Sequence, residues 1–193
     1  MNLRIEPLNG EMAETFIEFF EGMSFDHAPH WATCYCRFYH TDTAQDEWME
    51  RRGSENRREA LEEIKAGRMK GYLAFDGDRC IAWLNANHAK TYLRLAEDMM
   101  PVVGDRKVGV VICYVVHHEY RRKGISKALL QRAVDDFRDE GYEAVIALPI
   151  ELEENGDPEK RELLYRGHLK MYETFGFNEI QRHGNLHVMW LKL

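Results

Sequence analysis

Several features are scarce in this sequence, and each shortage excludes a class of protein. The 193 residues include four cysteines, without the paired spacing of a disulfide framework or a structural zinc site. No apolar segment approaches the about 20 residues that a transmembrane helix needs. The first twenty residues also lack the basic and then apolar regions of a secretory signal. We therefore expect a cytoplasmic protein with reduced thiols and no membrane partner.

A surplus of positive charge is also missing. The chain has 26 Lys and Arg against 33 Asp and Glu, for a formal net charge of −7. That balance disfavours attraction to nucleic acid. The arginines of residues 46–66 are interleaved with glutamates, which is typical of a solvated helical face. We expect no nucleic-acid partner.

What the sequence contains is a globular composition, 45% hydrophobic and 31% charged, which predicts one domain over residues 1–193. Apolar periodicity and glycine positions predict a mixed α/β layer of strands flanked by helices. Strands are expected over 3–8, 69–75, 80–87, 108–116, 144–150 and a pair around 183–185. Helices are expected over 11–21, 46–66 with a break at 53–54, 90–100 with Pro101 at its end, 125–140 and 162–175. The segments 25–42 and 151–161 are expected to be loops.

The segment 110–130 is the most informative part of the chain. It has the pattern of a buried strand, a basic turn, a glycine and the start of an amphipathic helix. That order places unpaired backbone N–H groups and a helix N-terminus beside a strand end, where phosphate binds well. A phosphate site next to an apolar strand indicates a ligand with a charged head and a neutral tail.

Three motifs together resemble one family. Residues 121–126, Arg-Arg-Lys-Gly-Ile-Ser, resemble the R/Q-x-x-G-x-G/A motif of GNAT acyltransferases. The hairpin expected over 71–87 precedes it at the usual place, and residues 171–177 resemble the family's Tyr-x-x-x-Gly-Phe ending. The resemblance covers about residues 69–193. One departure is Ser126, where Gly or Ala is usual; serine is small enough to let the loop approach phosphate.

The resemblance implies a fold, a co-substrate and a set of binding residues. The fold is a GNAT-like mixed, mostly antiparallel central sheet with splayed central strands flanked by helices. Acetyl-CoA lies in the gap between those strands, with backbone groups of Tyr114 and Val116 on its pantetheine arm. The turn that would surround the pyrophosphate consists of Arg121, Arg122, Lys123, Gly124, Ile125, Ser126 and Lys127.

Catalysis needs a proton for the leaving thiolate and a base for the amine. By resemblance, Tyr172 is the acid near the cofactor sulfur; the alternative is that its ring packs beside Phe175 and Phe177. The strand over 108–116 contains no His, Asp or Glu, which disfavours the branch with an acidic residue near Val110. The base stays open between the loop residues His117, His118 and Glu151 and a chain of water molecules.

The Cys- and aromatic-rich segment 31–40 has three interpretations. The possible zinc ligands are Cys34, Cys36, His30 and His40, but their spacing is poor for a zinc site, so we expect no metal. A buried aromatic and thiol cluster is the simplest interpretation. The third is a wall for the acceptor, with Trp31 and Tyr39 offering apolar surface with a polar end. The hairpin residues Trp83 and Asn85 are further acceptor candidates.

We therefore expect a GNAT N-acetyltransferase that moves the acetyl group of acetyl-CoA directly to an amine of a small molecule or peptide. No cysteine occupies a motif position that would indicate an acyl-enzyme. The alternative is a catalytically silent CoA-binding sensor or partner-binding domain, which the missing strand base permits. A metal-binding module built on Cys34 and Cys36 is a weaker third hypothesis. The sequence allows a homodimer and does not identify the acceptor.

Overall fold

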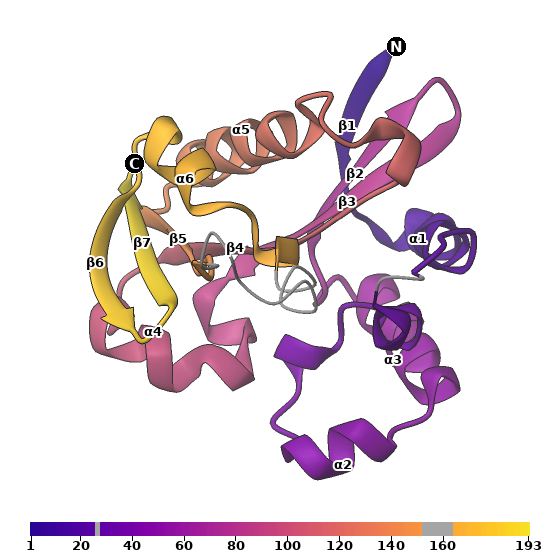
Figure 1. Cartoon of the computed structure of the whole chain (residues 1–193), viewed down its shortest axis with the longest axis horizontal. Helices are drawn as coiled ribbons and strands as arrows, with labels where there is room; N and C mark the ends of the chain where they lie inside the picture. The colour runs from indigo at the N-terminus through magenta and orange to yellow at the C-terminus, as the bar shows by residue number, and fades with distance from the viewer. Residues whose placement is uncertain (26–27, 152–163) are drawn as a thin grey trace.

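A seven-stranded sheet organises the computed structural model, which describes residues 1–25, 28–151 and 164–193 (Figure 1). The strand order is β1-β2-β3-β4-β5-β7-β6. Only the β4–β5 pair is parallel among these strands; the other pairs are antiparallel. The strands are β1 Leu3–Pro7, β2 Gly71–Asp76, β3 Arg79–His88, β4 Val108–Val116, β5 Ala144–Ala147, β6 Asn178–His183 and β7 Leu186–Lys192. The predicted mixed, mostly antiparallel α/β fold is confirmed.

Helices cover both faces of the sheet. In Figure 1, α5 and α6 lie on one side, and α2, α3 and α4 lie on the other. The helices are α1 Ala13–Glu21, α2 Gln45–Glu50, α3 Gly53–Lys65, α4 Ala96–Val103, α5 Ile125–Asp139 and α6 Leu169–Phe175. The break predicted at 53–54 falls earlier, at residues 51–52 between α2 and α3, because Gly53 and Ser54 already belong to the second helix. No helix in the described parts of the chain has the length and apolar character to cross a bilayer.

The helix predicted over 90–100 is wrong in both bounds. Two short 3-10 turns, Ala89–Thr91 and Leu93–Leu95, come first, and α4 then runs to Val103 with Pro101 inside it. Proline removes one backbone hydrogen bond but permits helical φ, so it does not stop this helix. The residue after the helix does: Gly104 has φ +55°, the left-handed conformation common just past a helix end.

The helix predicted over 162–175 begins only at Leu169. Gly167 precedes it with φ +83°, and a right-handed helix cannot continue through that backbone conformation. A 3-10 turn over 164–166 stands before this glycine. The predicted loop over 151–161 lies outside the described residues except for Glu151.

Strand alternation divides the core between the two faces. Successive side chains of a strand point to opposite faces of the sheet. Tyr72 and Leu84 therefore join the cluster under α5, whereas Leu73 and Trp83 join the cluster under α1 and α3. Each cluster combines apolar strand residues with apolar residues of the helices that cover it, such as Leu129 of α5 and Phe16 of α1.

The central strands diverge after four residue pairs. Residues 108–111 of β4 pair with residues 144–147 of β5, and there the pairing ends. β4 continues to Val116 on β3 alone, past a register shift at Asn85 and Ala86. The β5 side of β4 is therefore open over 112–116, which is the splay that the family resemblance implied.

Gly109 holds α5 against the sheet at the closed end of this splay. A Cβ atom there would lie 2.8 Å from ring atoms of Phe137, a contact too short for two carbon atoms. We expect Gly109→Ala to lower the free energy of unfolding by about 1–3 kcal/mol, as overpacking does. Chemical denaturation measures this loss. In a Phe137→Leu background, Gly109→Ala should lower the free energy of unfolding by a smaller amount. An equal loss in both backgrounds would contradict the contact between residue 109 and Phe137.

Candidate functional site

A cleft of about 890 Å³ opens where β4 and β5 part. Of the ten residues predicted for the site, eight line it: Tyr114, Val116, Arg121, Arg122, Gly124, Ile125, Ser126 and Lys127. Other lining residues come from two distant segments, including Phe25 and Trp31 from the first and Tyr165, Gly167 and Met171 from the second. The volume is in the range of clefts that enclose a large organic ligand.

The turn before α5 is shaped to hold an anion. Arg122 has φ +62° and Gly124 has φ +81°, so two residues of one short turn adopt the left-handed conformation. Turns that combine right- and left-handed residues gather N–H groups into anion-binding concavities. The α5 N-terminus has no side-chain cap, which leaves its first N–H groups for a ligand. Positive charge at this end of the cleft comes from three lining residues, Arg121, Arg122 and Lys127.

The edge of β4 presents backbone groups to the same cleft. The His117 N–H donates to the Ile81 carbonyl on β3. Because alternate residues direct their backbone groups to opposite sides, those of Val116 and Tyr114 face away from β3. The Val116 carbonyl accepts a hydrogen bond from Arg121 Nε at 3.3 Å, which agrees with that direction.

Two predicted residues do not line the cleft. The Lys123 ammonium lies 5.0 Å from the ring centroid of Tyr120, which does line it. Tyr172 is fully buried in α6, and its hydroxyl donates to the Arg166 carbonyl at 2.7 Å. That hydroxyl also lies 3.4 Å from the hydroxyl of the lining residue Tyr114.

Gly167 brings the Tyr172 hydroxyl close to the cleft wall. A Cβ atom on Gly167 would lie 2.7 Å from that hydroxyl, so any side chain there would displace the tyrosine. Burial raises the pKa of Tyr172 well above its ordinary value, and the neighbouring Tyr114 raises it further. The phenol therefore keeps its proton and can act as a donor.

The model of the acetyltransferase (GNAT) family matches residues 30–177, more than half of the chain. The chain belongs to the GNAT acetyltransferase family. No curated protein sequence matches it.

Solved GNAT structures share the fold at low identity. The NatC complex bound to Gag peptide and CoA contains a chain with 17% identity and a TM-score of 0.55, covering 100% of this chain and 99% of that one. The PaiA N-acetyltransferase of Thermoplasma acidophilum, in complex with coenzyme A, has 16% identity, a TM-score of 0.55 and 100% coverage of both chains. A GNAT acetyltransferase of Listeria monocytogenes has 10% identity and a TM-score of 0.59, covering 99% of this chain and 95% of that one.

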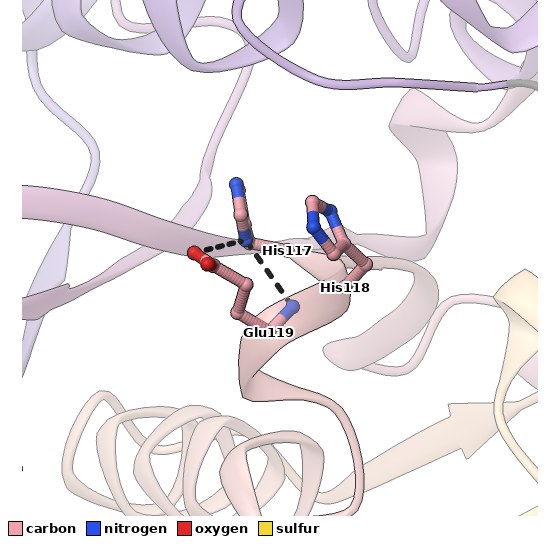
Figure 2. Close-up of side chains that lie close together, drawn as sticks. All are labelled: His117, His118 and Glu119. Carbon is pink, nitrogen blue, oxygen red and sulfur yellow. Dashed lines mark hydrogen bonds and ion pairs between the residues drawn. The ribbon is translucent and has the colours of Figure 1, made fainter.

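The residues after β4 form a compact polar group beside this GNAT cleft. Figure 2 shows His117, His118 and Glu119 close together, and ligand atoms of the three lie within 4.8 Å of one another. Arg79 already occupies this group: it donates to His117 Nε2 at 2.9 Å and to Glu119 Oε2 at 3.0 Å. A guanidinium in that position opposes a metal cation. Among the described residues no other group of three or more has metal-ligand geometry, so the Cys34, Cys36, His30 and His40 set is not assembled.

The three side chains considered for the base all lie outside the cleft lining. His117 is buried and bonded to Arg79, His118 is exposed, and Glu151 pairs with Arg182 at 2.7 Å. The imidazole in the described lining belongs to His168, which the sequence analysis missed. The spacing could have revealed it, because residues four apart share a helix face and His168 precedes Tyr172 by four.

The segment 31–40 contributes to both the core and the cleft. Tyr35 and Cys36 are buried, and Cys36 Sγ lies 3.2 Å from Cys113 Sγ and accepts from Trp83 Nε1. Trp31 lines the cleft, with its ring centroid 5.2 Å from that of Tyr165. Cys36 is therefore packed in the core, as the simplest interpretation expected, while Trp31 at the start of the segment reaches the site.

His40 anchors this segment through a neutral ring. The Tyr92 hydroxyl donates to Asn85 Oδ1 at 2.8 Å, which turns the Asn85 amide nitrogen toward His40 Nε2 at 3.0 Å. An amide nitrogen only donates, so His40 Nε2 accepts and carries no proton. Burial, with the charge of Arg37, lowers the pKa of His40 to about 4.

We expect the protein to lose stability between pH 6.5 and pH 4 because of His40. In that interval the unfolded histidine binds a proton that the folded one does not, so the free energy of unfolding falls as the pH falls. The loss should reach about 2–3 kcal/mol near pH 4. Denaturation curves of the protein and of His40→Gln, taken at several pH values, isolate the contribution. Parallel pH profiles for the two proteins would rule it out.

Proposed function

We propose that this protein transfers the acetyl group of acetyl-CoA directly to an amine of a small molecule or peptide. The observation that carries the proposal is the cleft of a GNAT family member, with an uncapped helix N-terminus at one end and an open strand edge along its wall. Two CoA-bound structures share this fold. The residues fit the chemistry of CoA, a phosphorylated head on a neutral amide-containing arm.

In this proposal the cleft residues divide the binding of the thioester between them. The turn from Arg121 to Lys127 holds the pyrophosphate through N–H groups and positive charge. The outward backbone groups of Tyr114 and Val116 pair with amides of the pantetheine arm. Lys123, which lies over Tyr120 outside the lining, adds charge near the same end.

The reaction forms a bond from the amine nitrogen to the acetyl carbon and breaks the bond from that carbon to sulfur, while the nitrogen gives up one proton to solvent water. The leaving thiolate then needs a proton, and we assign its donation to Tyr172. Its raised pKa keeps the phenol protonated, and its 3.4 Å approach to the Tyr114 hydroxyl connects it to the cleft. Positioned acids of this kind contribute a rate factor of about 10²–10⁴.

Binding of acetyl-CoA is the first test, and two glycines make a matched pair. Gly124 and Gly141 have φ of +81° and +74°, and a Cβ on either would meet nothing within 4 Å. Alanine imposes a similar backbone strain at both, about 1–2 kcal/mol. Only Gly124 lies in the cleft, in the turn that we propose holds the pyrophosphate, so strain there distorts the N–H groups that bind the ligand. Calorimetry should therefore find the affinity for acetyl-CoA about tenfold weaker or worse in Gly124→Ala.

Gly141→Ala serves as the control and should bind acetyl-CoA as the unaltered protein does. Equal affinity in both variants would remove the pyrophosphate role of the turn. No binding of acetyl-CoA or CoA by the unaltered protein at millimolar concentration would refute the proposed function. Binding without consumption of acetyl-CoA across a broad amine panel would favour the alternative, a CoA-binding sensor or partner-binding domain without catalysis.

Replacement of Tyr172 by Phe tests the acid. We expect kcat to fall by about 10²-fold or more, because the donor is lost, while the affinity for acetyl-CoA changes less than about twofold. Tyr142→Phe is the matched control, since Tyr142 packs on Phe137 away from the cleft. Thermal denaturation of both variants checks that the fold is retained. An unchanged kcat in Tyr172→Phe would remove the role.

A further inference from the structure

Arg166 stands in the chain between two residues of the cleft wall, is not itself among the lining residues, and is connected to the proposed acid. It ends the 3-10 turn over 164–166, with Tyr165 before it and Gly167 after it in the lining. Its carbonyl accepts the hydrogen bond from the Tyr172 hydroxyl at 2.7 Å. Its side chain reaches the far end of β5, where Nη1 lies 3.5 Å from the Leu148 carbonyl. One residue therefore connects the acid to the β5 side of the splay.

The surroundings of the guanidinium are aromatic and neutral. The Arg166 Cζ atom lies 5.3 Å from the ring centroid of Tyr39 and 5.9 Å from that of Tyr165. Arg166 Nε donates to the Tyr165 hydroxyl at 3.4 Å, and the two tyrosine hydroxyls are hydrogen-bonded to each other. Burial raises the pKa of both phenols, so neither supplies a negative charge.

Most of the partly buried arginines in the described parts of the chain pair with a carboxylate, whereas Arg166 and Arg94 do not; Arg94 lies over the rings of Phe38 and Trp48 instead. Arg37 and Arg51 both pair with Glu59, and Arg132 pairs with Asp136. Within the described parts of the chain, no carboxylate lies within the 4.0 Å ion-pair distance of Arg166. A partly buried guanidinium whose partners are all neutral is costly unless an anion completes it. Its planar donors suit a carboxylate in a bidentate arrangement.

We propose that Arg166 binds a carboxylate of the acceptor, so that the substrate is a small amine bearing its own carboxylate, such as a free amino acid. This inference rests on the proposed acetyl transfer. The carbonyl of Arg166 contacts the proposed acid, and its guanidinium would hold the anion in the same part of the molecule, which suits a small acceptor. Trp31, 5.2 Å from Tyr165 between ring centroids, supplies an apolar wall for the rest of the molecule. Polyamines, which have only positive charge, would be repelled.

The decisive comparison uses free α-amino acids against their primary amides as acceptors. We expect kcat/KM of the unaltered protein to favour the free acids by about 10- to 100-fold, because the amide loses a charge-assisted pair. Arg166→Met should abolish the preference and raise KM, with the affinity for acetyl-CoA changed less than about twofold. Arg166→Lys keeps the charge but not the planar fork, and should retain part of the preference.

Arg138→Met is the matched control, because Arg138 is exposed at the end of α5 and pairs with Asp135. It should leave the preference unchanged. Acetylation of amides or of a diamine as efficient as that of amino acids would overturn the carboxylate site and leave the acetyltransferase activity standing. The same comparison in the unaltered protein needs no variant to fold.

A binding measurement separates the inference from the proposed function. If no amine is acetylated, amino acids are titrated by calorimetry into the protein saturated with CoA. Binding of amino acids to the unaltered protein that is lost in Arg166→Met would support the carboxylate site, even though the proposed acetyl transfer would be refuted. Absence of such binding would overturn the inference.

Discussion

The site depends on one interruption of backbone pairing, the end of the β4–β5 ladder after Val111 and Ala147. Parallel strands normally continue to satisfy each other's backbone groups, and unpaired groups are costly when they are buried. Beyond this point β4 keeps β3 on one side and opens a cleft on the other. Amides of a ligand can form hydrogen bonds with the backbone groups of β4 that β5 leaves unpaired. The fold therefore exposes a strand edge in its interior, where a ligand can act as the missing strand.

The second element of the site is a turn held in an unfavourable conformation. Arg122 adopts a left-handed backbone without being a glycine, and Gly124 repeats that conformation just before α5. Strain of this kind is found where the surrounding structure or a ligand stabilises it. Here α5 is fixed on the sheet by Phe137 against Gly109, which places its uncapped N-terminus at the cleft. Packing at one end of the helix thus determines the position of charge at the other.

Acceptor recognition, in the proposals made above, comes from segments that lie far apart in the sequence. Trp31 and Tyr39 belong to the irregular segment before α2, whereas Tyr165 and Arg166 belong to the turn before α6. They meet through the Tyr39–Tyr165 hydroxyl contact and the Trp31–Tyr165 ring contact. The anion-binding turn lies apart from this cluster, in the segment between β4 and α5. In these proposals the GNAT cleft separates thioester binding, which uses local backbone geometry, from acceptor binding, which uses tertiary contacts.

The sequence by itself determined the sheet fold, the family and the place of the turn that we propose binds the pyrophosphate. Their evidence is local: the apolar run of β4, the glycine at 124 and the apolar spacing of α5 follow one another in about twenty residues. Helix bounds at Pro101 and before Leu169 were wrong, because the left-handed Gly104 ends α4 beyond Pro101 and the left-handed Gly167 prevents α6 from beginning earlier. Only the tertiary structure decided that the Tyr172 hydroxyl donates a hydrogen bond to the Arg166 carbonyl and that His117 accepts one from Arg79. It also placed Arg166 among neutral partners. These contacts join residues whose separation in sequence carries no periodic pattern, so only the packing of the elements could reveal them.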